Sequence, residues 1–419
     1  MSSRGYHRQN KPLKGILWIV LCCIISTYFS SAVVAQSFEF KGKRQKQTIN
    51  FLKVKNLIII PVYINEKGPY NFLLDTGVGQ MIITDTAFLR TLNVKTFKRI
   101  RLQGYGIGEE IDALLTREVY ARVGKATIKN IPTAIFKNDI FDLSSYLGTK
   151  IHGIIGYYFF YSFVVRINYA TDKLTLYKPG SAIRKKGTAI PLKIKNGKPY
   201  LEADITLQNL KTRVNLLVDN GSSHPLMLES LKGAAFPLPA VTIPANLGVG
   251  LNGEIYGMMG RIDCIQTNAF SFEHILSGFP DFKADRLSIE GNQRNGTIGA
   301  DVLNHFLVTF DYRNELLYLQ KTSNYKAEFN HDMAGIEIYV RQGKTNHYFI
   351  SRIEPGSPAE EAGLLKDDEI LTINFRDIDS YSLNNLSEIF REKDGNAMIM
   401  EVGRRGAKVV AIFRLKKRI

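Results

Sequence analysis

The chain of 419 residues is long enough for two or three domains, each with its own core, and an apolar content of 45% excludes a wholly disordered protein. Its formal net charge of +16 is scattered and accompanies no nucleic-acid-binding motif, so it favours an anionic cell envelope over DNA or RNA. The His residues are few and dispersed and no HExxH motif occurs, so neither a metal nor another cofactor is expected.

The first 35 residues have the pattern of a signal peptide. A basic start is followed by an apolar run from Ile16 to Ile25, and small residues then lead to Val33-Val34-Ala35, typical of a cleavage site before Gln36. The basic start consists of Arg4, Arg8, Lys11 and Lys14. An uncleaved anchor helix, giving membrane association, is the alternative, although the apolar run is short for a full span.

Cleavage of this leader would change the charge and the cysteine content. The mature chain would carry a net charge of about +12. Cys264 would be its one cysteine, because Cys22 and Cys23 lie in the leader, and no internal disulfide is expected. A lipid-anchored Cys22 is a third alternative, but the residues around it fit a lipobox poorly.

The rest of the sequence contains an internal duplication. An apolar run from Gly68 ends in Asp75-Thr76-Gly77, and a similar run from Lys211 ends in Asp219-Asn220-Gly221. Further along, Gly153–Gly156 is matched by Gly296–Gly299. The offset stays near ~143–144 positions, which indicates two similar units rather than a solenoid. We place these units at residues 36–185 and 186–321.

Both units are dense in Val, Ile, Phe, Tyr and Thr, with Gly, Asn and Asp between short runs, which predicts β structure. Each also has a glycine-rich segment about 30 residues past its Asp, where glycine at a hairpin tip permits close approach to a ligand. These segments contain Tyr105, Gly106, Ile107 and Gly108 in the first unit, and Gly248, Val249 and Gly250 in the second. The letters of Gly248–Gly253 also fit a dinucleotide-binding fingerprint, but no βαβ unit surrounds them.

Two aspartates, one from each unit, suit the hydrolysis of an amide bond. Carboxylates a few Å apart cannot both ionise, so Asp75 and Asp219 would share one proton. The ionised member would activate a water, while the protonated member polarises the carbonyl and protonates the leaving nitrogen. The glycine that follows each Asp-x pair allows the tight turn that such an arrangement needs.

The sequence Leu73-Leu74-Asp75-Thr76-Gly77 resembles the active-site motif of pepsin-like and retropepsin-like aspartyl proteases, and the resemblance extends over about Phe51–Lys321. It implies two pseudo-symmetric β lobes in a mainly β protein, with Asp75 and Asp219 as the catalytic pair. It also implies that the glycine-rich segments are flaps and that the active-site loops are supported by Thr76, Gly77, Asn220 and Gly221.

One position departs from the family pattern, because Asn220 stands where the family has Thr or Ser. The Asn amide can hydrogen-bond and tolerates turn geometry, so it could replace part of a tie between the two loops. It could also mark a second lobe that has lost its geometry. Whether Asn220 supports the paired carboxylates therefore distinguishes an active protease from a silent protease fold.

After Lys321 a polar stretch, Thr322–Asp332, is predicted to be a linker. The run Pro355–Asn374 resembles the PDZ domains of bacterial envelope proteases, which assigns residues 333–419 to a PDZ domain of mostly β structure. The resemblance implies a groove walled by a helix at about 383–392, where a peptide C-terminus adds as an extra strand. The peptide-binding residues would be Met333, Ala334, Gly335, Ile336, Glu337 and Ile338. A PDZ domain that only packs is the alternative.

Together these features predict an exported aspartyl endopeptidase of the bacterial periplasm or cell envelope, with polypeptide as substrate and a PDZ domain that recruits it. The rival hypothesis is a silent protease fold that binds peptides through its PDZ domain. A sugar- or envelope-binding protein has no motif in its favour.

Overall fold

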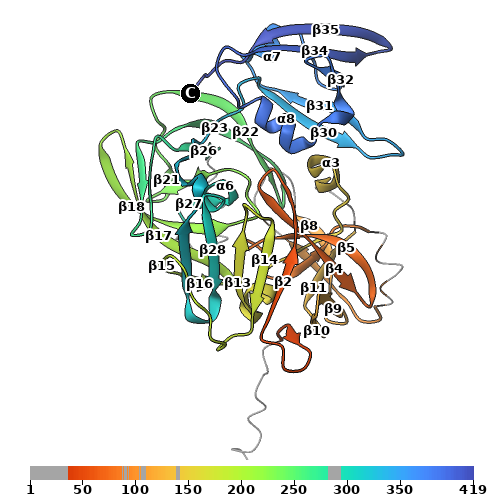
Figure 1. The fold of residues 1–419 in the computed structure, drawn as a ribbon, viewed down its shortest axis with the longest axis vertical. Helices are drawn as coiled ribbons and strands as arrows, with labels where there is room; N and C mark the ends of the chain where they lie inside the picture. Colours follow the sequence, from red (N-terminus) through yellow and green to blue (C-terminus); the bar gives the residue numbers. More distant parts are fainter. Residues whose placement is uncertain are drawn as a thin grey trace, which may run out of the picture. The chain divides into compact units, whose positions relative to one another are not determined.

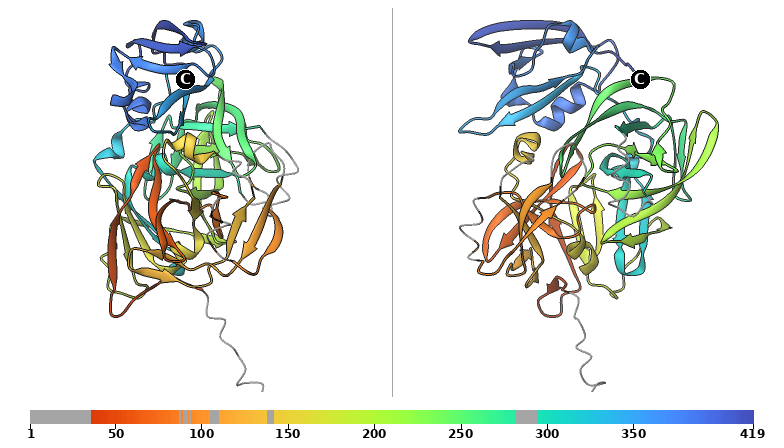
Figure 2. Two further views of the ribbon diagram at one scale, coloured as in Figure 1. Left: turned by 90° about the vertical axis from the view of Figure 1, so that its right-hand side faces the viewer. Right: turned by 180° about the vertical axis from the view of Figure 1, so that it is seen from behind.

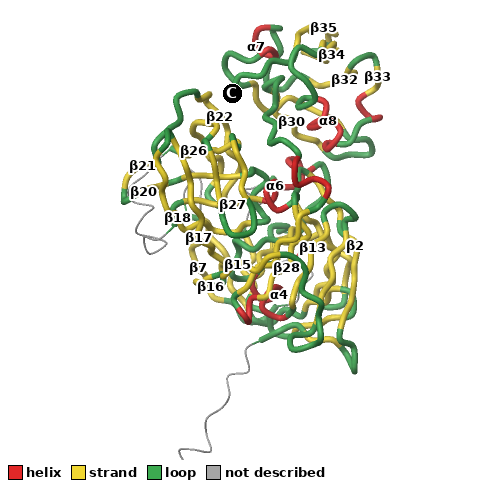
Figure 3. Tube along the Cα trace, turned by 60° about the vertical axis from the view of Figure 1, so that its left-hand side comes forward, coloured by secondary structure: helices red, strands yellow, loops and turns green. Residues whose placement is uncertain are grey.

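The computed structural model describes residues 36–86, 88, 92, 94–102, 104, 110–137, 142–281 and 294–419. The predicted leader, residues 1–35, and the first predicted flap, Tyr105–Gly108, lie outside this set. The described chain is mostly strands (Figures 1 and 3), which confirms the predicted mainly β fold. Among the described residues, no helix is long and apolar enough to cross a membrane.

The first unit is built around one sheet, with strand order β1-β10-β9-β4-β5-β12-β6-β11-β8-β7 and β3 paired with β4. Its strands are β1 (Glu39–Phe40), β3 (Leu52–Val54), β4 (Leu57–Ile64), β5 (Lys67–Leu74), β6 (Met81–Ile83), β7 (Lys98–Leu102), β8 (Ile111–Thr116), β9 (Ala121–Val123), β10 (Ala126–Ile128), β11 (Thr133–Phe136) and β12 (Gly153–Ile155). Two short helices, α3 (Leu143–Leu147) and α4 (Tyr157–Ser162), flank β12. Strand β4 is rich in β-branched residues, which suit a strand on a packed face. Its Ile58, Ile60 and Val62 side chains are buried in the core.

The second unit repeats this plan, with strand order β22-β23-β26-β19-β27-β18-β17-β24-β25 and β16 paired with β17. Its strands are β16 (Lys193–Lys195), β17 (Lys198–Leu207), β18 (Leu210–Asp219), β19 (Leu226–Leu228), β20 (Ser230–Leu231), β21 (Ala234–Ala235), β22 (Thr242–Gly250), β23 (Gly253–Arg261), β24 (Cys264–Gln266), β25 (Ser271–Glu273), β26 (Leu276–Pro280) and β27 (Gly296–Gly299), followed by helix α6 (Ala300–Leu303). In the first unit β12 runs parallel to β5 and antiparallel to β6. In the second, β27 has the same relation to β18 and β19.

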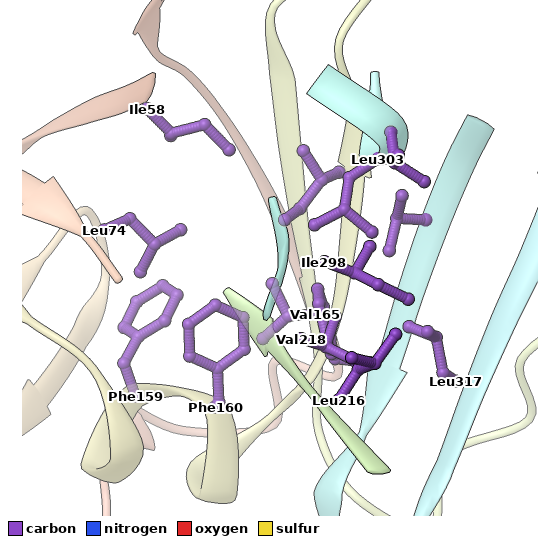
Figure 4. Close-up of a cluster of buried hydrophobic side chains, with 14 of the residues drawn as sticks. Ile58, Leu74, Phe159, Phe160, Val165, Leu216, Val218, Ile298, Leu303 and Leu317 are labelled. Atoms are coloured by element: carbon purple, nitrogen blue, oxygen red, sulfur yellow. The ribbon is translucent and has the colours of Figure 1, made fainter. Parts of the chain in front are cut away.

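A further sheet joins the two units, with strand order β15-β29-β28-β13-β14-β2. Its strands are β2 (Lys46–Asn50), β13 (Val164–Asn168), β14 (Lys173–Tyr177), β15 (Thr188–Pro191), β28 (Phe306–Asp311) and β29 (Leu316–Lys321). Its centre pairs equivalent strands of the duplication, because Arg166 of β13 lies opposite Thr309 of β28. Figure 4 shows Leu74, Phe160, Val218 and other buried side chains of both units in one continuous cluster, so the lobes share a core.

The predicted linker Thr322–Asp332 is packed against the second lobe. A short 3-10 turn spans Ser323–Lys326, and the ring of Phe329 lies 5.1 Å from that of Phe272 and 4.6 Å from that of His305. The segment is therefore anchored by aromatic contacts, which composition alone did not indicate.

The C-terminal domain has the strand order β30-β31-β32-β34-β35, with β33 paired with β32 (Figure 2). Its elements are β30 (Ile336–Arg341), β31 (His347–Ile353), α7 (Pro358–Glu361), β32 (Glu369–Ile373), β33 (Arg376–Asp377), α8 (Leu383–Ile389), β34 (Ala397–Arg404) and β35 (Ala407–Arg414). Helix α8 begins at a capping box, in which the Ser382 hydroxyl accepts from the Asn385 N–H and the Asn385 side chain reaches back. Strand β30 forms one edge of the sheet, as the predicted peptide-binding strand should.

Candidate active site

The two Asp-x-Gly loops have the same local structure. Asp75 directly follows β5 and its N–H donates to Ile155 O (2.9 Å), while Asp219 ends β18 opposite Gly299 of β27. Each carboxylate accepts the N–H of the glycine two residues on: Gly77 N to Asp75 Oδ1 is 2.6 Å, and Gly221 N to Asp219 Oδ1 is 2.9 Å. These bonds orient both carboxylates and stabilise their charged forms.

The two carboxylates lie beside one another and over each other's loops. A Cβ atom added to Gly221 would lie 2.5 Å from Asp75 Oδ2, and one added to Gly77 would lie 2.9 Å from Asp219 Oδ2. Only glycine leaves room for the opposite carboxylate at these two positions. The structure thus brings together the two residues that the duplication singled out.

Asn220 and Thr76 tie the loops together. Thr76 Oγ1 donates to Val218 O (2.7 Å) and accepts from Asn220 N (3.0 Å). In return, Asn220 Nδ2 donates to Leu74 O (2.8 Å) and Asn220 Oδ1 accepts from Thr76 N (2.8 Å). Both side chains are fully buried. The Asn amide therefore makes both of the bonds that the Thr hydroxyl makes, through separate atoms.

Burial is the first cause that raises the pKa of Asp75 well above its usual value, and the charge of Asp219 and a hydrogen bond with it are the next. The Gly77 N–H and the Lys198 ammonium act in the opposite direction. The same site raises the pKa of Tyr312, through burial first and then through both carboxylates. Two carboxylates this close do not both ionise readily, so such a pair shares one proton over part of the pH range.

The aspartates lie in a cavity of about 840 Å³ that both lobes line. Its apolar walls include Leu73, Ile82, Ile154, Leu217, Met227 and Ile255. The predicted second flap also lines it, because Gly248, Val249 and Gly250 lie at the tip of the β22–β23 hairpin. Gly248 has φ +110°, a conformation that glycine adopts readily.

The cavity also contains residues that no motif identified. Lys198 comes from the Asn196-Gly197 turn between β16 and β17, and Tyr146 comes from α3. An Asn-Gly pair signals a hairpin turn, but its position over the cleft depends on tertiary structure. His224 follows the second loop, and burial lowers its pKa to about 4, so it is neutral at ordinary pH.

The predicted peptide-binding segment of the C-terminal domain forms a loop followed by the start of β30. Ile336, Glu337 and Ile338 belong to β30, while Met333 N donates to Phe390 O (2.9 Å). The backbone N–H groups expected to bind a peptide's terminal carboxylate are hydrogen-bonded within the chain itself. Ala334 N and Gly335 N both donate to Asp332 Oδ1, at 2.9 and 2.6 Å. In the part of the chain that the structure describes, His, Cys, Asp and Glu do not gather in groups of three or more able to ligate a metal.

Comparison with known protein families assigns two parts of the chain to domain families. Residues 60–159 match the model of an aspartyl protease domain, and residues 349–404 match that of a PDZ domain. No curated protein matches the chain.

Two solved structures are similar over parts of the chain. A retropepsin-like aspartic protease from Rickettsia conorii is 20% identical over 35% of this chain and 97% of its own, with a TM-score of 0.25. The aspartic proteinase from Irpex lacteus is 12% identical over 68% of this chain and 100% of its own, with a TM-score of 0.39. The family-model matches confirm the resemblance found in the sequence over these two parts: the chain contains an aspartyl protease domain, followed by a PDZ domain.

Proposed function

We propose that this chain is an aspartic endopeptidase that hydrolyses peptide bonds in polypeptide lying in the cleft between its two lobes. The observation that carries this proposal is the paired, half-buried Asp75 and Asp219, each oriented by its own glycine N–H and joined by the Thr76–Asn220 tie. The mainly apolar cleft favours substrates with apolar side chains beside the scissile bond.

The chemistry follows from the single shared proton. The ionised carboxylate takes a proton from a water as the water oxygen bonds to the scissile carbonyl carbon. The protonated carboxylate gives its proton to the carbonyl oxygen, which forms a tetrahedral diol. When the diol collapses, the C–N bond breaks, one carboxyl protonates the departing nitrogen, and the other carboxylate takes a proton from a diol hydroxyl as the new carbonyl forms, so the pair again holds one proton.

The rival hypothesis, a silent protease fold, depended on Asn220. Its argument is weakened, because the Asn amide supplies a donor for Leu74 O and an acceptor for Thr76 N. The raised pKa of Asp75 also favours a working pair, since paired carboxylates held at electrostatic cost are typical of active sites.

We also propose that the protein is exported to a bacterial periplasm or cell envelope and that its PDZ domain binds polypeptide for the protease. Export rests on the leader pattern of residues 1–35, and the mature chain needs no disulfide. The scattered positive charge suits an anionic envelope.

The test of protease activity is cleavage of a peptide library by the wild type, Asp75→Asn and Asp172→Asn. Asp172 lies in a turn of the first lobe outside the cleft, in a partly exposed ion pair with Lys53, so it controls for an Asp→Asn change away from the site. We expect cleavage by the wild type and by Asp172→Asn, and none by Asp75→Asn. Equal cleavage by all three would exclude the carboxylate mechanism.

A further inference from the structure

The PDZ groove between β30 and α8 is filled by the chain's own helix α3. Helix α3 of the first lobe packs against β30. Gly148, just after α3, lies between the two groove walls: a Cβ atom added there would lie 2.9 Å from Leu383 Cδ1 of α8 and 3.2 Å from Val340 Cγ2 of β30. Leu147 is 2% exposed and belongs to the same buried cluster as these walls. The place where a peptide strand would add is therefore occupied.

Polar contacts hold this arrangement on both sides of the groove. On the β30 side, Gln342 Nε2 donates to Ser144 O of α3 (3.1 Å). On the α8 side, Asn384 Oδ1 accepts from Lys55 N (2.9 Å), and its Nδ2 donates to Lys53 O (2.8 Å). The first lobe thus fixes both walls as well as filling the space between them.

The carboxylate end of the groove is also satisfied internally. The Ala334 and Gly335 N–H groups, which would hold a ligand's terminal carboxylate, donate to the Asp332 carboxylate instead. A peptide C-terminus must therefore compete with two parts of this chain: Asp332 at the loop and the α3 segment, residues 142–148, along the groove.

The α3 segment also touches the catalytic cleft. Lys55 Nζ lies 3.7 Å from the centroid of the Tyr146 ring, and the Tyr146 hydroxyl hydrogen-bonds with Ser223. Ser223 follows the second catalytic loop, and both Tyr146 and Ser223 line the cavity that contains Asp75 and Asp219. Tyr146 therefore links the first lobe to the second across the cleft.

We propose that the α3 segment is an internal latch that closes the PDZ groove. A polypeptide ending in apolar residues and a free carboxylate binds only when the latch leaves, because Val340, Leu383 and the buried face of α8 form apolar walls. Its departure separates Tyr146 from Ser223 and opens the cleft to long substrates. The proposal about peptide binding at the groove does not depend on the proposed function, whereas the effect on the cleft rests on it.

The binding test compares Gly148→Asp with Gly180→Asp, both in the Asp75→Asn background so that peptides are not cut. Both glycines have positive φ, +61° and +79°, but nothing lies within 4 Å of a Cβ atom at Gly180. The two variants therefore carry the same backbone strain and charge, and only Gly148→Asp places a carboxylate between Leu383 and Val340. The probe is a fluorescein-labelled peptide pool with a degenerate C-terminal tetrapeptide, in free-acid and amidated forms.

We expect the free-acid pool to bind Gly148→Asp at least tenfold more tightly than Gly180→Asp, because a closed groove lowers the apparent affinity by the fraction that is open. The amidated pool should bind neither variant. Equal affinity for both variants, or binding that ignores amidation, would overturn the latch.

A second variant tests the latch in the opposite direction. Gly148→Cys with Leu383→Cys, in a Cys264→Ser background, is designed to join these positions by a disulfide, because a Cβ atom at position 148 lies 3.6 Å from Leu383 Cγ, near where the sulfur of the second cysteine would stand. The oxidised form should lose peptide binding and the reduced form should regain it. Binding that persists in the oxidised form contradicts the proposal even if Gly148→Asp fails to fold.

The cleft is tested in the active enzyme with denatured casein as the long substrate. The tightest free-acid peptide from the pool should raise casein cleavage severalfold, and its amidated form should not. Peptide binding without any change in casein cleavage would refute the effect on the cleft. Peptide binding by an enzyme that cleaves nothing would refute the proposed function and leave the latch standing.

Discussion

The two Asp-x-Gly loops of the candidate active site and the loop before β30 of the PDZ domain use an aspartate in the same local way. Asp75 and Asp219 each accept the N–H two residues on, and Asp332 accepts those two and three residues on. The two regions differ in the other groups that surround the carboxylate. Asp75 lies beside a second carboxylate in a cavity, whereas Asp332 lies at the base of a groove that the chain itself fills. The local turn is common, so the surroundings decide whether an aspartate does chemistry or holds a loop.

The largest expected effect comes from Asp75→Asn, which should lower kcat at least about 1,000-fold, because the amide cannot exchange the shared proton. The free energy of unfolding should change little, since the pair is held at electrostatic cost. Steady-state kinetics and urea denaturation measure the two effects. Asp332→Asn is the matched control in the PDZ loop and should keep nearly full activity; a comparable loss in kcat there would erase the distinction between the two regions.

The pH dependence of activity should separate the same two regions. Because the pKa of Asp75 is raised, the pair keeps its proton to a higher pH than an ordinary carboxyl would. Above that pKa the proton is lost, so kcat/KM should fall about tenfold per pH unit. The same alkaline fall is expected in Asp332→Asn. If the fall in kcat/KM occurred at a different pH in the variant, the PDZ loop would take part in the chemistry.

Changes at Asn220 test whether the tie needs both a donor and an acceptor. Asn220→Asp removes the donor to Leu74 O and buries a charge, so we expect a loss of about 2–4 kcal/mol in the free energy of unfolding and most of the activity. Asn220→Thr restores the hydroxyl of the first loop and should keep activity within about threefold of the wild type. If Asn220→Thr is as damaging as Asn220→Asp, the amide has a role beyond the tie.

The smallest effect is expected for the stability of Asp332→Asn. Burial, followed by the charge of Glu354, raises the pKa of Asp332 to about 7. Since the folded state binds the proton more tightly than the unfolded state, stability present below about pH 4 is lost as pH rises through 7. The neutral amide still accepts both N–H groups and escapes that loss, so Asp332→Asn should be more stable by about 1–3 kcal/mol at pH 8.

Urea denaturation of both proteins at pH 4 and pH 8 measures this difference. Asp172→Asn serves as the control for the chemical change at an ordinary turn. An Asp332→Asn protein that weakens between pH 4 and pH 8 as much as the wild type would show that this carboxyl titrates normally.

The sequence indicated that the two Asp-x-Gly loops form one site because the duplication repeats them at a fixed offset. Strands at equivalent positions then pair in equivalent ways, β5 with β12 and β18 with β27, and this brings Asp75 and Asp219 together. Asn220 could be foreseen only in part, since its chemistry permits the tie but its geometry is set by Thr76 of the other lobe.

The latch could not be predicted from the sequence. Residues 142–148 belong to no motif, and their partners Val340 and Leu383 lie about 200 positions away. The anchoring of Phe329 was missed for the same reason, because a polar stretch with only Tyr325 and Phe329 as aromatic residues has no pattern of burial. The role of Asp332 was hidden by the common occurrence of Asp in turns.

The buried tie has a consequence for how this protein ages. Asn220-Gly221 is the dipeptide most prone to deamidation, in which the glycine nitrogen attacks the side-chain amide carbon and ammonia leaves. In the folded chain that nitrogen is engaged by Asp219 and both amide atoms are bonded across the lobes, so the attack is blocked. An unfolded chain has no such protection, and the aspartate that forms there cannot remake the tie. Time spent in the unfolded state therefore exposes the centre of the candidate active site to an irreversible chemical change.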